Sequence, residues 1–254
     1  MVAPAFTWEH IEAMRPQIRA TVNRLLDEMI ERGCSQPVDL VDTFALPIPS
    51  QIMYSILGVP VEDVELLNHT NAVRTNGSST AAAAADANDE LLQYLGRLVD
   101  KRVERAEDDL ISKLVGEQLK PGIIDRLDAV QMSFLLLVAG NATLANMIAL
   151  GVVTLLEHPG QLEDLKRDPS LAKPFVDELC RYHTSSALAT RRVAKQDITL
   201  RGQIIKAGEG IIASNQSANR DGDVFPDPDK FDLHRTRGAG EGLGIGVLPR
   251  GAKY

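Results

Sequence analysis

Cysteine is scarce in this sequence. The chain has only Cys34 and Cys180 in 254 residues. Two cysteines cannot build the framework of cross-links that holds small secreted domains together. The sequence therefore indicates a protein of a reducing compartment that folds around an apolar core.

Basic residues and aromatics are also few. The 27 Lys and Arg residues are outnumbered by 35 Asp and Glu residues, which gives a net charge of -8. This balance argues against nucleic acid or an anionic membrane as the main partner. Apolar residues make up 44% and aromatics only 4%, as in a globular protein with an aliphatic core. No basic region followed by an apolar stretch marks a signal peptide at the N-terminus.

Proline is absent from residues 128–157, which are apolar almost throughout. A helix of this length spans about 45 Å. A helix that is apolar on all sides is either buried or crosses a membrane. Asn141, Thr143 and Asn146 lie at its centre and no basic loops flank it, so we expect a buried helix.

The middle of this helix, residues 139–143, has small and polar side chains where a core helix carries Leu or Ile. Gly140 costs about 1 kcal/mol relative to alanine at such a position. Asn141 and Thr143 need hydrogen-bond partners if they are buried. One interpretation is a helix crossing that requires small residues. The other is a helix that passes over a large flat ligand.

The remaining pattern predicts a mainly α protein with a small β-rich C-terminal part. We expect helices at residues 17–32, 50–57, 62–69, 81–100, 109–118, 159–167 and 169–183, and strand or extended chain at residues 38–46. Thr7 is the expected N-cap of a first short helix. Residues 191–205 and 209–213 alternate between apolar and polar side chains and predict short strands. The charged residues 101–109 are interpreted as a solvated face.

Two pairs of charged residues stand out near the C-terminal part. Glu178 and Arg181 lie three apart on one helix face, where the flanking apolar residues predict partial burial and a third partner. Arg191 and Arg192 follow residues 184–190, whose small hydroxyl side chains are suited to lining a cavity. Adjacent arginines become functional when an anionic group lies nearby.

Together these motifs resemble the cytochrome P-450 superfamily of haem-thiolate oxidoreductases over residues 6–243. Residues 139–143 resemble the oxygen-side motif of its long central helix, and Glu178-x-x-Arg181 resembles its Glu-x-x-Arg motif. Residues 225–231, followed by Arg235, resemble its meander. The resemblance implies haem b as cofactor, with Arg192 on a propionate and Ala139 and Gly140 close to the ring. It also implies that Glu178, Arg181 and Arg235 form one structural network.

Residues 74–80, 178–184 and 211–221 are similar to one branch of this superfamily, the fungal nitric oxide reductases. Monooxygenases of the superfamily usually carry an acid immediately before the threonine, where it helps deliver protons for O–O cleavage. Ala142 stands at that position here. The resemblance therefore implies reduction of two molecules of nitric oxide to nitrous oxide, with NADH or NADPH as electron donor and no redox partner protein.

The same resemblance assigns roles to individual residues. It places Thr143, Ser186 and Asn141 in the catalytic pocket. It also implies that Arg74 and Arg191 bind the phosphates of the nicotinamide cofactor. The substrate is a small molecule, and neither nucleic acid nor a membrane is implied. The expected compartment is cytoplasmic or mitochondrial.

The chain departs from the superfamily at the axial ligand. The family holds its iron with a cysteine thiolate, but residues 242–254 contain no cysteine. We expect a partial P-450-like domain at residues 1–246, shortened at both ends, followed by a divergent tail at residues 247–254. A monooxygenase with a separate redox partner and a non-catalytic remnant remain as alternatives.

Overall fold

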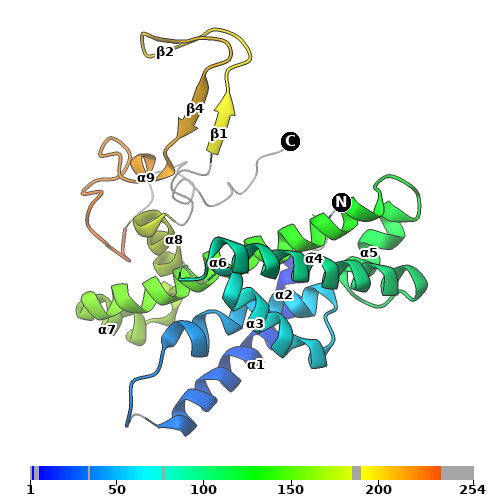
Figure 1. The fold of residues 1–254 in the computed structure, drawn as a ribbon. Coiled ribbons are helices and arrows are strands. Elements are labelled where there is room, and N and C mark those ends of the chain that lie inside the picture. Colours follow the sequence, from blue (N-terminus) through cyan, green and yellow to red (C-terminus); the bar gives the residue numbers. More distant parts are fainter. Residues whose placement is uncertain (1, 3–5, 34, 76–77, 185–189, 236–254) are drawn as a thin grey trace. The chain divides into compact units, whose positions relative to one another are not determined.

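The structure is a computed model that describes residues 2, 6–33, 35–75, 78–184 and 190–235 (Figure 1). The chain divides into two compact units, Met1–Asn146 and Met147–Tyr254. Within the described residues, all the strands belong to the second unit, and helices dominate the rest. The predicted fold class is confirmed.

Helices make up the first unit, and side chains at their starts cap several of them. Thr7, Thr80 and Asp109 each accept a hydrogen bond from the backbone N–H three residues later, which satisfies a donor that the helix itself leaves free. The elements in order are α1 (Trp8–Arg32), a π-helical turn (Val41–Ala45), α2 (Pro47–Leu57), a 3-10 turn (Val61–Asp63), α3 (Val64–Thr75), α4 (Ala81–Glu104), α5 (Leu110–Leu114), a second π-helical turn (Val115–Leu119) and the beginning of α6 (Arg126–Glu157).

The core of the first unit is aliphatic, as the composition predicts. Apolar side chains recur at helical spacing along α4 and face apolar side chains of α2, α3, α5 and α6. The most deeply buried members of this cluster, each at most 2% exposed, are Tyr54, Leu57, Leu67, Leu91, Leu95, Leu98, Val99, Ile111, Val115, Ala129 and Leu137.

A buried ion pair joins the ends of three helices in this unit. Arg102 of α4 donates from Nε to Asp109 Oδ2 at 2.6 Å and from Nη2 to the Gly58 carbonyl at 2.8 Å. Arg102 and Asp109 are 5% and 6% exposed, respectively. The interpretation of residues 101–109 as a solvated face is wrong for these two residues, because their charges neutralise each other inside the unit.

Helix α6 is continuous, as predicted. Its first part packs against α2 within the first unit, and its last part packs against α8 within the second unit. A Cβ built on Gly140 would lie 2.9 Å from Met53 Cγ, and one on Gly151 would lie 3.1 Å from Leu179 Cδ2. Among the described helices, α6 is the one that is long and apolar enough to cross a membrane, with 28% of its most apolar window buried. Its close contacts with α2 and α8 are those of a helix packed within a protein.

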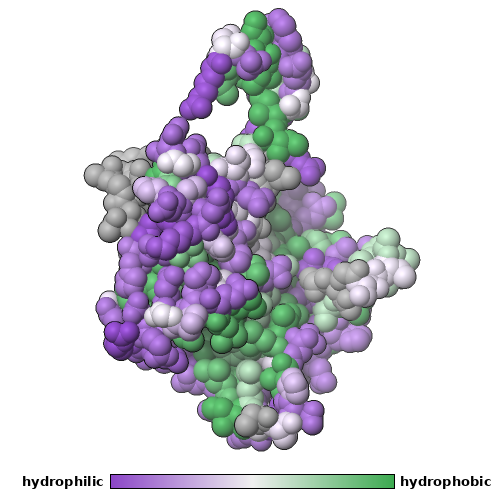
Figure 2. All heavy atoms as spheres, turned by 90° about the vertical axis from the view of Figure 1, so that its left-hand side faces the viewer, coloured by the Kyte–Doolittle hydropathy of each residue, from purple (hydrophilic) through white to green (hydrophobic). Residues whose placement is uncertain are grey.

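Part of α6 is nevertheless exposed, contrary to the expectation of a helix buried on all sides. Large apolar side chains of α6 with more than a third of their surface exposed are Leu127, Leu135, Leu144, Leu150, Val153 and Leu156. Figure 2 shows apolar atoms at the surface between polar ones. Exposed apolar side chains in this number are typical of a surface that another group covers.

The second unit continues from α6 through α7 (Pro159–Arg167), a 3-10 turn (Pro169–Leu171) and α8 (Ala172–His183) to four strands and α9 (Asn215–Ala218). Strand β1 (Thr190–Val193) pairs antiparallel with β4 (Gly210–Ala213), and β2 (Ile198–Leu200) pairs antiparallel with β3 (Gln203–Ile205) (Figure 1). Both residues of the β2–β3 turn, Arg201 and Gly202, have positive φ, as a two-residue hairpin turn requires. The predicted short strands are confirmed.

Two local predictions are wrong. The first short helix and the helix expected at residues 17–32 are one helix, α1, which continues through Pro16 despite the N–H that proline lacks. Residues 38–46 are not extended, since residues 41–45 form a π-helical turn. Asp39 explains this turn because its Oδ1 accepts the N–H groups of Val41 and Asp42 at 2.8 and 3.1 Å, which starts helical chain at that point.

Candidate functional site

The glutamate and two arginines predicted to interact form one network in the second unit. Arg181 donates from Nε and Nη2 to both carboxylate oxygens of Glu178 at 2.8 Å, and Arg235 Nε approaches the same oxygens at 3.1 and 3.2 Å. The side chains of Glu178, Arg181 and Arg235 are 4%, 2% and 15% exposed, respectively. The predicted network is confirmed, and it is buried more completely than the sequence indicated.

Arg181 also donates hydrogen bonds to backbone carbonyls of the chain around and after the end of α9. Its Nη1 donates to the carbonyls of Asn219 and Pro228 at 2.8 and 2.7 Å, and its Nη2 donates to the Lys230 carbonyl at 3.1 Å. Arg181 therefore has several acceptors besides the carboxylate of Glu178. Irregular chain without strand pairing is held in place by these bonds.

The C-terminal end of α8 is fixed by two polar contacts. His183 Nε2 lies 2.7 Å from Thr154 Oγ1 of α6, and this hydroxyl also lies 2.7 Å from the Leu150 carbonyl. The single hydroxyl proton goes to the carbonyl, so His183 donates from Nε2. Thr184 follows with φ +51, and its hydroxyl donates to the Arg181 carbonyl and accepts from Asn219 Nδ2.

The predicted pocket residues of α6 lie on different faces of the helix. Ala139 and Thr143 are exposed, and Ala142 is half-buried. Asn141 is 0% exposed, so the structure does not bring its side chain together with that of Thr143. Gly140 is next to the Met53 side chain, which supports the helix-crossing interpretation of this glycine. Its predicted place beside a haem ring stays a prediction, and Ser186 lies outside the described residues.

Arg74, predicted to attract a phosphate, is half-buried at the end of α3. It donates from Nε and Nη2 to Asn71 Oδ1 at 3.2 and 2.9 Å, and no carboxylate forms an ion pair with it among the described residues. Burial lowers the pKa of the Arg74 guanidinium and raises that of the nearby Tyr54 phenol, so Tyr54 stays neutral and does not balance the charge.

The other two predicted phosphate or propionate ligands lie on β1 of the second unit. Arg191 and Arg192 are both exposed, and Arg192 donates from Nη1 to the Arg191 carbonyl at 2.8 Å. Antiparallel pairing with β4 sets their backbone opposite Ile212 and Ile211. Their charges are therefore free to meet an anionic group, as the sequence predicted, but the described residues include none beside them.

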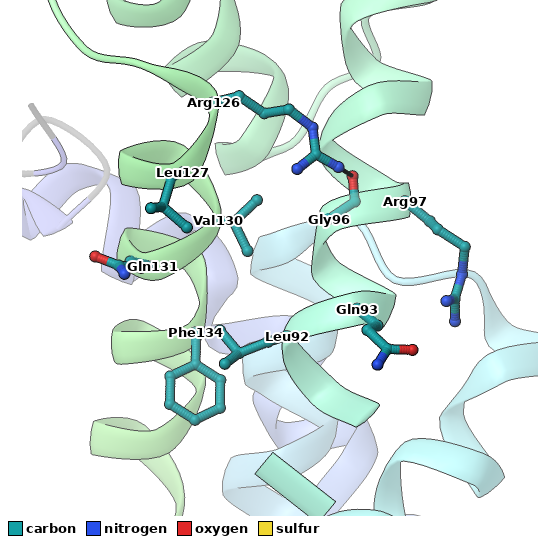
Figure 3. A pocket seen from close by; sticks show the side chains of 9 residues that line it. All are labelled: Leu92, Gln93, Gly96, Arg97, Arg126, Leu127, Val130, Gln131 and Phe134. Atoms are coloured by element: carbon teal, nitrogen blue, oxygen red, sulfur yellow. Dashed lines mark hydrogen bonds between the residues drawn. The ribbon is translucent and has the colours of Figure 1, made fainter. Parts of the chain in front are cut away.

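Side chains of α4 and α6 line a groove in the first unit. Its volume is about 720 Å³, and Figure 3 shows Leu92 and Phe134 facing each other below Val130. Arg126 closes one end: it donates to Asp100 at 2.6 and 2.7 Å and to the Gly96 carbonyl at 3.1 Å. Gly96 allows this approach because a Cβ there would lie 3.1 Å from Arg126 Nη2.

Comparison with known proteins identifies the class to which this arrangement belongs. The family model for Cytochrome P450 matches residues 108–237, which include the whole of α6, the Glu178 network and the four described strands. The chain belongs to the cytochrome P450 family.

Individual relatives agree with this. Cytochrome P450 55A3 of Fusarium lichenicola is 61% identical over 249 residues, which are 98% of this chain and 61% of that protein. Cytochrome P450 105A3 of Streptomyces carbophilus is 40% identical over 97% of this chain and 60% of its own length. The crystal structure of cytochrome P450 MoxA from Nonomuraea recticatena superposes with a TM-score of 0.86 at 38% identity, over 92% of this chain and 58% of MoxA. The chain thus spans about three fifths of the length of the relatives it matches.

The family implies a haem, but the cysteines of this chain do not fit its thiolate ligand. Cys180 points into a cluster with Leu179, Phe231 and Leu233, and burial raises the pKa of its thiol. A ligand thiolate needs the opposite shift. Cys34 lies outside the described residues, at the end of α1 in sequence. The donor set that the sequence offers is therefore not that of a thiolate-ligated haem.

Two polar contacts in these helices were missed by the sequence interpretation. The pairing of Arg102 with Asp109 had a signal, since Asp109 precedes an apolar stretch at an N-cap position. The bond between His183 and Thr154 joins residues 29 apart, and nothing in the sequence relates them.

Proposed function

We propose that the protein is a nitric oxide reductase of the cytochrome P450 type, which converts two NO, NADH or NADPH, and a proton into N2O, NAD(P)+ and water. The observation that carries the proposal is Ala142. It occupies the position before Thr143 where the family resemblance described in the sequence analysis implies an acid in oxygen-activating members. A half-buried methyl group there cannot deliver a proton, and reduction of NO requires no O–O cleavage.

The charge distribution around Arg74 supports a nicotinamide cofactor as electron donor. Its guanidinium is half-buried and donates to Asn71 rather than to a carboxylate among the described residues. A phosphate oxygen would supply the missing negative charge and accept from the free Nη1 group. Arg191 on β1 is the second proposed phosphate contact. Thr143, exposed on α6, and Ser186 are the proposed pocket hydroxyls that orient the substrate, and Arg192 is the proposed propionate contact.

The cysteine set favours a second candidate for the chain by itself: a P450-like protein without catalytic activity. Half-buried, protonated Cys180 does not replace a thiolate ligand, and the sequence of the tail contains none. Haem would supply the redox centre when bound. Because the donor set does not fit, the proposed reaction is assigned to a protein in which these residues are combined with a cysteine-bearing segment.

A chimera tests the proposal directly. Residues 6–243 replace the matching segment of Cytochrome P450 55A3, so that the flanking segments come from the relative. The purified chimera is supplied with NO and either NADH or NADPH, without any redox protein, and N2O is measured by gas chromatography. We expect N2O to form. If the chimera is instead a monooxygenase that depends on a separate redox partner, no N2O will form under these conditions, and the proposal is contradicted.

Arg74→Ala in the same chimera tests the cofactor assignment. Loss of a phosphate contact made equally in the ground and transition states raises KM for the nucleotide about tenfold or more and leaves kcat nearly unchanged. Arg19→Ala, which removes an exposed arginine from α1, is the matched control and should change neither constant. Equal effects of the two substitutions would contradict a phosphate contact at Arg74.

A further inference from the structure

Asn141 is the polar side chain of α6 whose burial is least explained. It is 0% exposed, and neither its Oδ1 nor its Nδ2 has a hydrogen-bond partner among the described residues. The other two buried polar residues of the helix behave differently. Ser133 and Thr154 each donate to the carbonyl four residues earlier, at 2.8 and 2.7 Å. Only the carboxamide of Asn141 lacks such a bond within the described part of α6.

The position of Asn141 shows that its amide faces the protein interior. It lies one turn after Leu137 and one turn before Ala145, which are 0% and 4% exposed. Gly140, the preceding residue, lies against Met53 of the same core. Ala139 and Thr143, two residues away on either side, are exposed. The amide is therefore turned away from the face on which Thr143 lies.

An unpaired amide at such a position is costly. Each buried polar group left without a partner shifts the folding equilibrium towards the unfolded state by roughly ten- to hundredfold. A leucine, whose side chain has the same branched four-atom shape, would avoid this cost, and apolar residues occupy the neighbouring buried positions Leu137 and Ala145. A ligand that satisfies the amide removes the cost, and unpaired groups of this kind are where such ligands are found.

We propose that Asn141 is a binding site for one buried water molecule in the core of the first unit. The ligand must both donate to Oδ1 and accept from Nδ2, which a water molecule does. A free anion or cation would satisfy only one of the two atoms, and an apolar ligand neither. Helix carbonyls keep a second lone pair, so the carbonyl one turn earlier provides a third partner for the water. Buried waters typically have about three such partners.

This assignment gives Asn141 a role different from the catalytic one predicted from the sequence. The water holds the turn of α6 that carries Gly140 and Thr143 from the interior side. Because it exchanges only when the helix opens locally, it links the hydration of the core to the opening of that turn. The proposal does not depend on the proposed nitric oxide reductase activity.

A pair of matched substitutions in the full chain tests the proposal. Asn141→Leu removes the buried amide, and Asn146→Leu makes the same chemical change five residues along α6 at an exposed position. We expect Asn141→Leu to raise the equilibrium constant for unfolding about tenfold relative to Asn146→Leu, because the water loses its main partner. A lower unfolding constant for Asn141→Leu would show that the amide was unpaired in the native protein and would overturn the proposal.

A direct measurement keeps the test decisive if Asn141→Leu does not fold. The chain is labelled with 15N-asparagine, and the side-chain amide signal of Asn141 is assigned by its loss in Asn141→Asp. We expect a rotating-frame Overhauser contact between this amide and a slowly exchanging water, and none for the exposed Asn146. A folded chain in which the Asn141 amide shows no such contact would equally overturn the proposal.

Discussion

Glu178 accepts hydrogen bonds from two arginines while only 4% of its side chain is exposed. Removal of one partner from a buried ion pair leaves the other charges uncompensated in a poorly solvated place. Surface pairs behave differently because water solvates whichever charge remains. The chain offers both situations at the same spacing, since Glu163 and Lys166 form an exposed pair three residues apart on α7.

We therefore predict that Glu178→Ala lowers the free energy of unfolding by about 3–5 kcal/mol. Glu163→Ala, the control with the same spacing, should lower it by less than about 1 kcal/mol. Denaturant titrations followed by circular dichroism measure both values. Similar small losses for the two substitutions would show that the buried network contributes no more than a surface pair.

His183 makes stability depend on pH. Burial is the main cause that lowers its pKa below the ordinary value; the Arg220 charge lowers it further, and Glu157 opposes the shift. The folded protein therefore holds neutral His183 at a pH where the unfolded chain already binds the proton. Its contribution to stability is complete above the imidazole's ordinary range and is lost as the pH falls through that range towards the lowered pKa.

We predict that His183→Gln flattens the loss of stability between about pH 7 and pH 5, a range set by the ordinary pKa of histidine. Thermal melts of the two proteins across this range measure the difference. His10→Gln is the control, because His10 lies in the first turn of α1 and its side chain makes no hydrogen bond with the described residues. If the two histidine variants keep the same pH dependence as the unsubstituted chain, the titration of His183 is not coupled to folding.

At the scale of helices, glycines mark where one element approaches another. Gly58 and Gly122 have nearly equal positive φ, +75 and +77, so alanine is strained at both. Only Gly58 is crowded, since a Cβ there would lie 2.3 Å from Asp109 Oδ2, whereas nothing lies within 4 Å at Gly122. Asp109 is held by Arg102 and cannot move aside without breaking the buried pair.

We predict that Gly58→Ala destabilises the chain by several kcal/mol, roughly 3 or more, because backbone strain is added to the loss of a buried ion pair. Gly122→Ala should cost about 1 kcal/mol, from backbone strain alone. The midpoints of urea denaturation give the comparison. Equal destabilisation would mean that Asp109 relaxes around the added methyl group.

Elements with local signals are those that the sequence predicted well. Thr7, Thr80 and Gly58 mark helix ends through their own hydrogen bonds or backbone conformation, so their sequence context is sufficient. Residues 38–46 were misjudged because their β-branched residues favour extended chain, whereas the carboxylate of Asp39 starts a helical turn. Pro16 was misjudged because a break was expected where the helix only loses one hydrogen bond.

In the candidate site, too, contacts with a local sequence signal or a known motif were predicted, and contacts that arise from packing were not. Glu178 and Arg181 are close in sequence, and Arg235 was placed with them by resemblance to a known motif. Asn141 and Thr143 were placed in one pocket by resemblance to the family's central-helix motif, but positions two apart on a helix point about 200° apart. His183 and Thr154 meet only through packing of α8 on α6, which no local pattern encodes.

At the scale of the whole molecule, the chain combines the architecture of a cytochrome P450 with cysteines that do not fit the family's ligand. Haem–thiolate ligation in this family changes the electronic character of the iron. A thiol in the apolar surroundings of Cys180 stays protonated, because burial raises its pKa. This chain therefore has the fold of the family, while the cysteines it contains do not fit the family's iron ligand.

We predict that the chain, expressed and mixed with haem, gives no thiolate-type Soret band after reduction under carbon monoxide. The chimera with the relative's flanking segments is the positive control and should give that band. Absorption spectra of both proteins make the comparison. A thiolate-type band from the chain by itself, abolished by Cys180→Ser, would show that α8 supplies the ligand after all.

The guanidinium of Arg181 has one more consequence, for the tolerance of the chain to sequence change. In the segment after α9 it binds the main-chain oxygens of Asn219, Pro228 and Lys230, rather than any of their side chains. Every residue has a carbonyl oxygen, so these three hydrogen bonds depend on the path of the backbone and not on the side chains of the residues that provide the acceptors. Substitutions at Pro228 and Lys230 therefore leave these acceptors in place, whereas insertion of a single residue between Asn219 and Lys230 would move the carbonyls that Arg181 requires.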